Sequence, residues 1–409
     1  MQVAELISDV LGQDVPIRVV AYDGSKAGPD HSDVALKVVT PRALARLATA
    51  PGTLGLARAY VTGEIEVDGD VYDVLNAMAD LTLHDLTRKE QLDLARKLFP
   101  VWLRHRQPIP ELEYRPRGRL HSKFRDSKVI SHHYDVSNRF YEWVLGPSMA
   151  YTCAVFPTKD ATLEEAQAAK HELVAQKLAL KPGMRLLDVG CGWGGMVMHA
   201  AAEHGVKALG VTLSRNQAEW AQAEIERRGL GDLAEVRHLD YRDAPESEFD
   251  AISSIGLTEH IGKANLPGYF TSLYERLKPE GRLLNHCITQ PHTPLTRRLD
   301  PFIARYVFPD GQLEPVGHLI SVMNDSGFEV RHEENLREHY ALTLKGWCEN
   351  LEEHWEEAVG EVGLGRARVW RLYMAASRLG FERDNIQLHQ VLGVKLGDRG
   401  RSGFPLRGW

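Results

Sequence analysis

The sequence predicts an α/β fold in which a doubly wound, parallel sheet follows a smaller N-terminal α/β domain. From about residue 160, short apolar runs typical of strands alternate with amphipathic stretches typical of helices. The first of these runs ends in a glycine-rich loop, "GCGWGG", and sheets of this kind bind ligands at the carboxyl ends of their strands. A chain of 409 residues is long enough for one large domain or two ordinary ones.

Residues 1–103 are expected to form the smaller domain. "VALKVVT" is typical of a strand, and "PRALARLAT" and "DVYDVLNAMADLTLHDL" have the spacing of amphipathic helices. Prolines and a change in composition then mark residues 104–130 as a linker. Residues 131–409 follow as the domain that holds the parallel sheet.

The predicted linker is basic, although the protein as a whole is acidic. Its basic residues are Arg104, Arg106, Arg115, Arg117, Arg119, Lys123, Arg125 and Lys128, and its acidic residues are Glu111, Glu113 and Asp126. One interpretation is a solvated linker. The other is a surface that meets anionic phospholipid headgroups, because each basic residue near such a surface adds ~1 kcal/mol of binding.

The large domain has its elements in a regular order. The expected strands are "RLLDVG", "KALGVTL", "AEVRHLD", "FDAISSIG" and "GRLLNHCIT". "GGMVMHAAAEH" and "RNQAEWAQAEIERRG" are expected to be the helices after the first two strands. From about residue 340 onward the pattern is mostly helical.

The composition excludes several classes of protein. An apolar share of 43% and a charged share of 26% are typical of a soluble globular protein, and a net charge of −7 gives no reason to expect nucleic-acid binding. The N-terminus lacks the features of a signal peptide, and no run of roughly 18 apolar residues is present to span a bilayer. The four cysteines lie far apart without zinc-ligand spacing, so we predict free thiols, no metal site and a cytoplasmic location.

The glycine loop favours S-adenosylmethionine (SAM) as the cofactor. Gly190, Gly192 and Gly195 satisfy GxGxxG, a pattern shared with dinucleotide sites. Asp188 lies two residues before the first glycine, as in SAM methyltransferases, and the next strand ends in "GVTLSRNQ" without the acidic residue that holds an NAD ribose. Glycines let the backbone approach bound SAM where a side chain would clash. NAD and a purely structural role for the glycines are the alternatives.

A series of motifs then occurs in unbroken order between about residues 120 and 390. They are "HHYDVSNRFYEWVLGPSMAYTCAVF", "LLDVGCGWGG", "GVTLSRNQ", "SSIGLTEHIG", "LLNHCIT", "FPDGQLEP" and "EHYALTLKGW". In this order they resemble the cyclopropane-fatty-acid synthases and the related mycolic acid cyclopropane synthases. The N-terminal "PGTLGLARAYVTGEIEVDGD" is similar to the leading domain of the members that act on phospholipids. The resemblance implies a class I SAM methyltransferase sheet with helical insertions.

The resemblance also implies a reaction. The cis double bond of an unsaturated acyl chain on a phospholipid attacks the methyl group of SAM, and bound bicarbonate deprotonates the resulting carbocation. The product is a cyclopropane or a methylene-branched precursor of tuberculostearic acid, which a separate reductase would complete. Methylation of a small-molecule O, N or C nucleophile is an alternative, as is a catalytically silent SAM- or lipid-binding protein.

The site residues follow from the same resemblance. Glu259, His286 and Tyr340 would hydrogen-bond bicarbonate, while Cys153 and Ile288 would act mainly through backbone N–H groups. The implied SAM contacts are Tyr134, Ser137, Tyr151, Thr152, Asp188, Gly190, Gly192, Gly194, Thr212, Ser214, Gln217, Asp240 and Tyr241. Relatives are often homodimers, although the sequence does not determine the oligomeric state, and such a protein is expected to bind peripherally to the inner face of the membrane.

Overall fold

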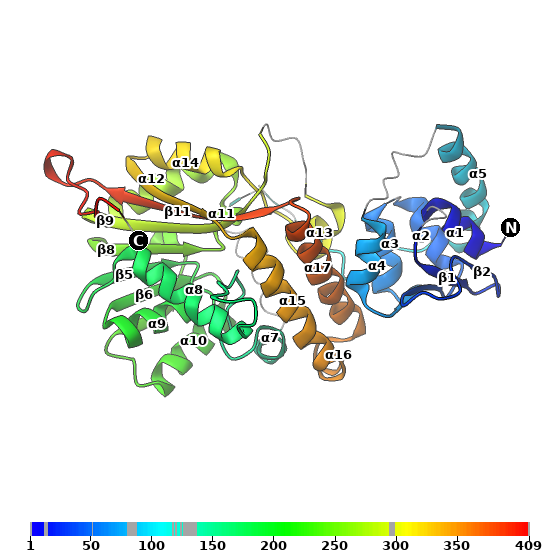
Figure 1. Ribbon diagram of the computed structural model, residues 1–409, viewed down its shortest axis with the longest axis horizontal. Helices are drawn as coiled ribbons and strands as arrows, with labels where there is room; N and C mark the ends of the chain where they lie inside the picture. Colours follow the sequence, from blue (N-terminus) through cyan, green and yellow to red (C-terminus); the bar gives the residue numbers. More distant parts are fainter. Residues whose placement is uncertain are drawn as a thin grey trace. The chain divides into compact units, whose positions relative to one another are not determined.

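Figure 1 shows the computed structural model, which describes residues 2–11, 15–50, 52–79, 88–116, 118, 121–122, 125, 137–293 and 299–407. The chain divides into two compact units. The smaller unit contains Met1–Arg115, Asp300–Pro309 and Trp355–Leu379, and the larger one contains Pro116–Leu299, Asp310–His354 and Gly380–Trp409. The smaller unit thus includes two segments from the second half of the chain. The domain boundaries after residues 103 and 130 stay a prediction.

The smaller unit is built on a four-stranded sheet with the order β2-β1-β3-β4. Its strands are β1 (Arg18–Ala21), β2 (Lys26–Ala27), β3 (Ala35–Val38) and β4 (Ile65–Asp68). Its helices are α1 (Val3–Leu11), α2 (Arg42–Thr49), α3 (Thr53–Val61), α4 (Val71–Met78), α5 (Arg88–His105), α13 (Pro301–Tyr306), α16 (Trp355–Val362) and most of α17 (Leu364–Glu382). The strand predicted at "VALKVVT" is β3, and the helix predicted at "PRALARLAT" is α2. The helix predicted at "DVYDVLNAMADLTLHDL" begins as α4, and residues 80–87 lie outside the described part of the chain.

Two ion pairs lie inside the smaller unit. Arg46 Nε is 3.1 Å from Glu64, and Arg58 Nη2 is 2.7 Å from Glu113, with every one of these side chains at most 9% exposed. Buried charges require such partners because an unpaired charge taken out of water costs several kcal/mol. Glu113 belongs to the predicted basic linker, so this part of the linker is packed into the smaller unit.

The larger unit contains a seven-stranded sheet with the order β10-β11-β9-β8-β5-β6-β7. Its strands are β5 (Arg185–Val189), β6 (Lys207–Thr212), β7 (Ala234–His238), β8 (Phe249–Ile255), β9 (Leu277–Thr289), β10 (Phe328–Asn335) and β11 (Gln387–Lys395). The strands from β9 to β7 pair in parallel, whereas β11 pairs antiparallel with β9 and β10. The predicted α/β fold with a doubly wound sheet is confirmed, and the strand order reverses between β5 and β8.

Helices cover both faces of this sheet (Figure 1). The helices of the larger unit are α7 (Asn138–Leu145), α8 (Leu163–Leu178), α9 (Gly195–His204), α10 (Arg215–Arg227), α11 (Thr258–Ile261), α12 (Leu266–Arg276), α14 (Val316–Asp325) and α15 (Arg337–Glu353). One buried cluster includes Val174 of α8 and Val197 of α9, and another includes Phe270 of α12 and Leu319 of α14. Burying such apolar side chains, at ~25 cal/mol per Å² of surface removed from water, attaches each helix layer to the sheet.

The C-terminal region is mostly helical, as the sequence predicts, but it also contains one strand that was not predicted. The sequence pattern after residue 340 predicts mostly helix, but Gln387–Lys395 forms β11 between β9 and β10. Leu388, Val391 and Val394 are buried there, together with the polar His389 and Gln390. A strand buried on both faces lacks the alternation of apolar and polar residues that identifies half-buried strands, so its pattern resembles that of a buried helix.

Gly210 of β6 is required for close packing of the sheet against α9 and the loop after β5. A Cβ atom at this position would lie 2.8 Å from both Cys191 Sγ and Val197 Cγ2. We expect Gly210→Ala to lower the free energy of unfolding by about 1–3 kcal/mol, because overpacking forces neighbouring atoms to shift. Urea unfolding would measure the change. Gly231→Ala is the matched control because a Cβ there meets nothing within 4 Å, and equal losses in the two variants would contradict the prediction.

Candidate active site

A cavity of about 450 Å³ lies in the larger unit, where the strand order reverses. Its lining includes the ends of β6 and β8, the loop that follows β5, and parts of α8 and α12. A doubly wound sheet leaves a crevice at this point, because the connections leaving neighbouring strands go to opposite faces. The volume is in the range of small-molecule and cofactor sites.

The glycine loop after β5 presents its backbone to the cavity. Gly190, Gly192 and Gly194 have φ angles of 75°, 55° and 78°, a region that residues with a Cβ rarely adopt. Gly190 and Gly192 line the cavity. Gly194, the N-cap residue of α9, does not belong to the lining, and a Cβ there would meet Ala221 and Val236 at 3.2 and 3.3 Å. The first two glycines therefore shape the cavity, and the third allows a helix to pack.

Asp188 at the end of β5 provides a buried carboxylate on the cavity wall. Its Oδ1 accepts a hydrogen bond of 2.6 Å from Ser253 Oγ. Burial raises the pKa of Asp188 to about 6, and the Ser253 hydroxyl and the Lys170 ammonium oppose this rise. The cavity thus contains an acidic group that is still mostly ionised at neutral pH.

Lys170 of α8 is a cavity residue that the sequence analysis missed. It is 1% exposed, and its Nζ lies 3.2 Å from Thr152 Oγ1 and 2.9 Å from His171 Nε2. Burial lowers its pKa to about 8, whereas the charge of Asp188 acts in the opposite direction. The available signal was a lysine at the helical spacing of apolar residues, four residues after Ala166 and four before Val174.

Two further strand ends supply predicted residues. Thr212, at the end of β6, donates a hydrogen bond of 2.8 Å to Gln217 Oε1, and both residues line the cavity. Tyr241 lines it as well and makes an edge-to-face ring contact with Tyr269, with centroids 5.2 Å apart. Asp240 does not belong to the lining, and its carboxylate binds Arg242 at 2.6 Å.

The structure therefore brings together most of the predicted SAM contacts. Those in the cavity wall are Tyr151, Thr152, Asp188, Gly190, Gly192, Thr212, Gln217 and Tyr241. Ser137 and Ser214 instead cap α7 and α10 with their hydroxyl groups, and Tyr134 lies outside the described residues. Wall residues that the sequence analysis missed include Lys170, Trp193, Leu257, His260 and Tyr269.

Glu259 lies on α11, immediately after β8, and is buried. Its Oε1 accepts a hydrogen bond of 2.6 Å from the backbone N–H of Ile288 on β9. Its Oε2 is buried without a hydrogen-bond partner among the described residues. Burial raises the pKa of Glu259 to about 7, against the lowering effect of the Ile288 N–H. The Ile288 N–H, expected to bind an anion, is occupied by this carboxylate.

His286 is fully buried on β9, two residues before Ile288. Its Nδ1 is 3.1 Å from Gln390 Nε2, and Gln390 Oε1 accepts a hydrogen bond of 2.7 Å from the buried Lys177. Its Nε2 is buried without a partner in the described part of the chain. Burial holds the pKa of His286 well below its usual range, and the Lys170 and Lys177 charges lower it further, so the ring is neutral.

Cys153 and Tyr340 are connected to Ile288 through Leu336, the residue before α15. Cys153 Sγ lies 3.7 Å from the carbonyl oxygen of Leu336, and Tyr340 N–H donates to the same oxygen at 3.1 Å. Leu336 N–H donates to Leu388 O at 2.8 Å, and Leu388 pairs with Ile288 across β11 and β9. All five predicted catalytic residues are described, and none of them lines the cavity. The contacts above connect Cys153, Tyr340 and Ile288, and Glu259 binds the Ile288 N–H.

The two unpaired atoms suit a small polar group. Glu259 Oε2 is a carboxylate acceptor when ionised, and the neutral His286 ring offers one nitrogen without a partner. Buried polar atoms are rarely left unsatisfied, so each of the two atoms is available to hydrogen-bond a bound ligand.

The raised pKa of Glu259 predicts a pH-dependent contribution to stability. The folded protein keeps this carboxyl protonated up to about pH 7, whereas the unfolded chain releases the proton near pH 4.5. Stability from this group is therefore fully present below pH 4.5 and falls as the pH rises to about 7, by roughly 3 kcal/mol. We expect Glu259→Gln, which stays neutral, to gain stability relative to the wild type over this interval in urea unfolding. A stability difference between the two proteins that is the same at both ends of the interval would contradict this.

Comparison with known proteins places the chain in a family. The profile described as "Mycolic acid cyclopropane synthetase" matches residues 121–391. The chain is 53% identical over 406 residues to "Probable fatty acid methyltransferase" of Mycobacterium tuberculosis, which covers 96% of this chain and 94% of that protein. It is 38% identical over 283 residues to "Cyclopropane-fatty-acyl-phospholipid synthase" of Escherichia coli, and this match covers 68% of this chain and 72% of that protein.

A solved structure agrees with these relatives. Mycolic acid cyclopropane synthase CmaA1, complexed with SAH and CTAB, is similar with a TM-score of 0.62 and 32% identity, and the match covers 65% of this chain and 97% of that chain. Residues 121–391, which the family profile matches, include the whole seven-stranded sheet except for the end of β11. The chain belongs to the mycolic acid cyclopropane synthetase family, as a SAM-dependent methyltransferase of the cyclopropane-fatty-acid synthase type.

Proposed function

We propose that this protein transfers one carbon from SAM to the cis double bond of an unsaturated acyl chain carried by a phospholipid. The observation that carries the proposal is the position of Glu259. Its neighbours Leu257 and His260 line the cavity, while the Glu259 carboxylate is directed to β9 and keeps Oε2 buried and unpaired. A carboxylate that is fixed by one hydrogen bond and has a second oxygen free, beside a cavity of cofactor size, suits a reaction in which a bound base removes a proton.

The cavity is the proposed SAM site, and SAM supplies an electrophilic methyl group. Gly190 and Gly192 leave room for its amino-acid part, next to which Asp188 attracts the ammonium group and Lys170 the carboxylate. Tyr241 offers a ring face to the adenine. SAH bound to CmaA1, a protein 32% identical to this chain, supports this choice of cofactor.

Glu259 and His286 are the proposed holders of bicarbonate, which supplies a weak base for the proton that the acyl carbocation must lose. Glu259 Oε2 accepts a hydrogen bond from the bicarbonate O–H, and His286 Nε2 donates one to a bicarbonate oxygen. Ile288 N–H orients Glu259 in this arrangement. Loss of the proton from the transferred methyl closes a cyclopropane, and loss after a hydride shift gives the methylene-branched chain.

Aromatic rings around this region suit a cationic intermediate. Tyr151 and Trp347 have ring centroids 5.3 Å apart, and Tyr340 lies 6.0 Å from Trp347 and 4.4 Å from Phe381. Ring faces stabilise a nearby positive charge without forming a bond to it. Burial raises the pKa of the Cys153 thiol far above its usual range, so Cys153 stays protonated and does not trap the cation.

Analysis of the lipid product tests this function. Purified protein with SAM, bicarbonate and dioleoyl phospholipid vesicles is expected to add one CH2 unit to the acyl chain. Proton NMR then distinguishes cyclopropyl signals from those of an exocyclic methylene group, because the two products have the same mass. The proposal fails if no CH2 is added at any bicarbonate concentration while calorimetry shows that SAM binds.

We further propose that the C-terminal end of α5 and the residues after it meet the membrane. Phe99, Leu103 and Ile109 are 58%, 66% and 48% exposed, and the exposed Arg104 and Arg106 lie among them. Large apolar side chains beside basic ones are typical of segments that lie in the membrane interface. Among the described residues, no helix is both long and apolar enough to cross a bilayer.

The rest of the predicted basic linker contributes less to this surface. Arg115 pairs with Glu113 at 2.9 Å, and Arg125 pairs with Asp310 at 2.6 Å, so their charges are already partly neutralised. Arg117, Arg119, Lys123 and Lys128 lie outside the described residues. The proposed membrane surface is therefore defined by residues 99–109.

We expect the double variant Phe99→Ser, Leu103→Ser to bind anionic phospholipid vesicles about tenfold more weakly, because two apolar anchors are lost. Co-sedimentation measures the binding, and added salt should weaken it further by screening Arg104 and Arg106. Leu406→Ser is the control, since Leu406 is an exposed leucine outside this surface. Equal binding of the wild type to neutral and anionic vesicles would count against an anionic membrane surface.

A further inference from the structure

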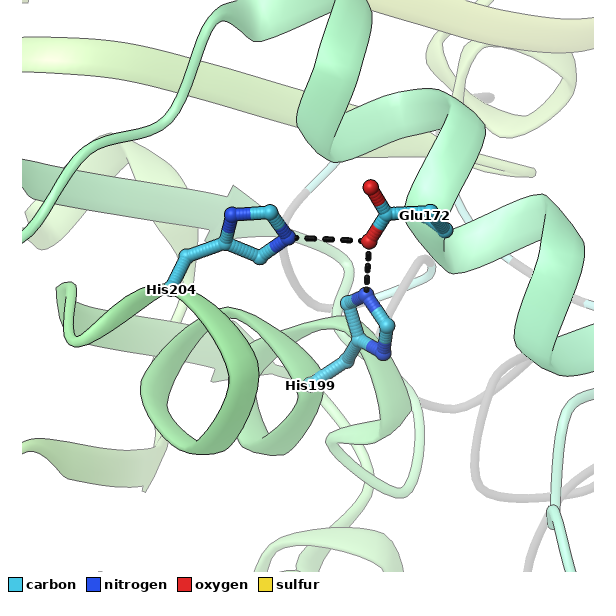
Figure 2. A group of neighbouring side chains, drawn as sticks. All are labelled: Glu172, His199 and His204. Atoms are coloured by element: carbon cyan, nitrogen blue, oxygen red, sulfur yellow. Dashed lines mark hydrogen bonds and ion pairs between the residues drawn. The ribbon is translucent and has the colours of Figure 1, made fainter.

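A second group of polar side chains lies on the surface of the larger unit. Glu172 of α8 and His199 and His204 of α9 point toward one another, as Figure 2 shows. Glu172 Oε2 is 3.2 Å from His199 Nε2 and 3.0 Å from His204 Nε2. The three side chains are partly buried, with 40%, 16% and 20% of their surfaces exposed.

The geometry points to a binding site for Zn²⁺ or a similar divalent transition metal, and we propose that Glu172, His199 and His204 are its ligands. One atom from each side chain lies within 4.8 Å of the other two. Tetrahedral zinc with bonds of about 2.0–2.2 Å holds its ligand atoms about 3.4 Å apart, so small side-chain rotations bring the three atoms to zinc distances. Two imidazoles and one carboxylate form a recognised zinc ligand set, and the partial exposure leaves the fourth position to water.

The surroundings of the three ligands support the proposal. Gln176 Nε2 donates a hydrogen bond of 2.9 Å to Glu172 Oε1, which turns the other carboxylate oxygen, Oε2, toward the two imidazoles. Hydrogen bonds of this kind orient metal ligands in known sites. The His171 ring lies 5.7 Å from the His199 ring and closes the side of the cluster that faces the cavity.

The position of the site assigns it a structural role. Glu172 follows the cavity residues Lys170 and His171 on α8, and α9, which carries both histidines, begins with the cavity residues Gly195 and Met196. A bound metal would therefore connect the two helices that carry part of the SAM cavity wall. The ligands are 27 residues apart between Glu172 and His199, a spacing that no short zinc motif contains, so the sequence analysis predicted no metal site.

Metal titration of the full-length protein tests the proposal. After removal of metals with EDTA, we expect ZnCl2 to bind with one site and a Kd below about 10 µM in calorimetry. Co²⁺ should give the visible absorption of a tetrahedral site, and Mg²⁺, which prefers oxygen ligands, should not compete. Zinc should also raise the Tm of the protein, since it binds the folded state.

Variants identify the ligands. His199→Ala and His204→Ala should each weaken zinc binding at least about 10-fold, and Glu172→Gln should do so while keeping the size of the side chain. His31→Ala, which removes an exposed imidazole outside the cluster, should bind zinc like the wild type. If the alanine variants do not fold, Glu172→Gln decides the outcome.

Two results would overturn the proposal. One is a wild-type protein that binds Zn²⁺ no more tightly than about 1 mM, which would leave the cluster as a carboxylate that accepts two hydrogen bonds. The other is zinc binding that the Glu172 and histidine variants retain in full. Both are independent of lipid turnover, so they do not depend on the proposed function.

Discussion

Glu259→Gln is expected to lower the rate of one-carbon transfer by about 10²-fold or more while SAM still binds. Glutamine keeps a carbonyl oxygen for the Ile288 N–H at 2.6 Å, but it places an NH2 group where the unpaired Oε2 lies. That group cannot accept a hydrogen bond, so the proposed base loses the partner that holds it. Turnover of oleoyl phospholipid measures the rate, and calorimetry with SAM measures the binding.

Glu314→Gln is the matched control for this variant. Glu314 is another buried carboxyl of the larger unit, and burial raises its pKa too. We expect its replacement to leave turnover within a small factor of the wild type. Full activity of Glu259→Gln would refute the assignment of Glu259. If high bicarbonate restored turnover by Glu259→Gln, the substitution would weaken only the binding of bicarbonate.

Asp188→Asn is expected to raise the Kd for SAM by about 10- to 100-fold. Asparagine still accepts the hydrogen bond of 2.6 Å from Ser253, so the local packing is retained. The negative charge is lost, however, and Lys170 then leaves the cavity with a net positive charge that disfavours the ammonium and sulfonium groups of SAM. Calorimetry with SAM and with SAH measures the change.

Asp243→Asn is the control for this charge, because Asp243 is an exposed acid near the same end of the sheet. It should leave the Kd for SAM unchanged. Because SAH lacks the sulfonium charge, Asp188→Asn should weaken SAH binding less than SAM binding. Equal losses for the two ligands would show that Asp188 acts on the shared amino-acid part only.

Local patterns predicted the sheet well. The five strands from β5 to β9 are apolar runs with helices or turns between them, and each was found at its predicted place. β11 was missed because it is buried on both faces and comes from the distant end of the chain. The two late segments of the smaller unit were missed for a related reason, since contacts between segments so far apart in sequence leave no local pattern.

The candidate site divides in the same way. Asp188, Gly190 and Gly192 share one loop, so a single motif predicted their place on the cavity wall. Lys170 comes from a helix before the sheet begins, and no motif names it. The unpaired Glu259 Oε2 and His286 Nε2 depend on tertiary packing. Ile288 N–H binds Glu259 Oε1 and Gln390 contacts His286 Nδ1, so the second polar atom of each side chain is left without a partner.

The chain of contacts from Lys177 to His286 determines which tautomer the histidine adopts. Lys177 can only donate, so the oxygen of the Gln390 amide faces it and the NH2 group faces His286 Nδ1. Nδ1 therefore accepts, and in a neutral imidazole the hydrogen is on Nε2. Lys177, acting through the Gln390 amide, thereby makes His286 Nε2 a hydrogen-bond donor at the candidate site. His286 is then unable to compete with the base for the proton.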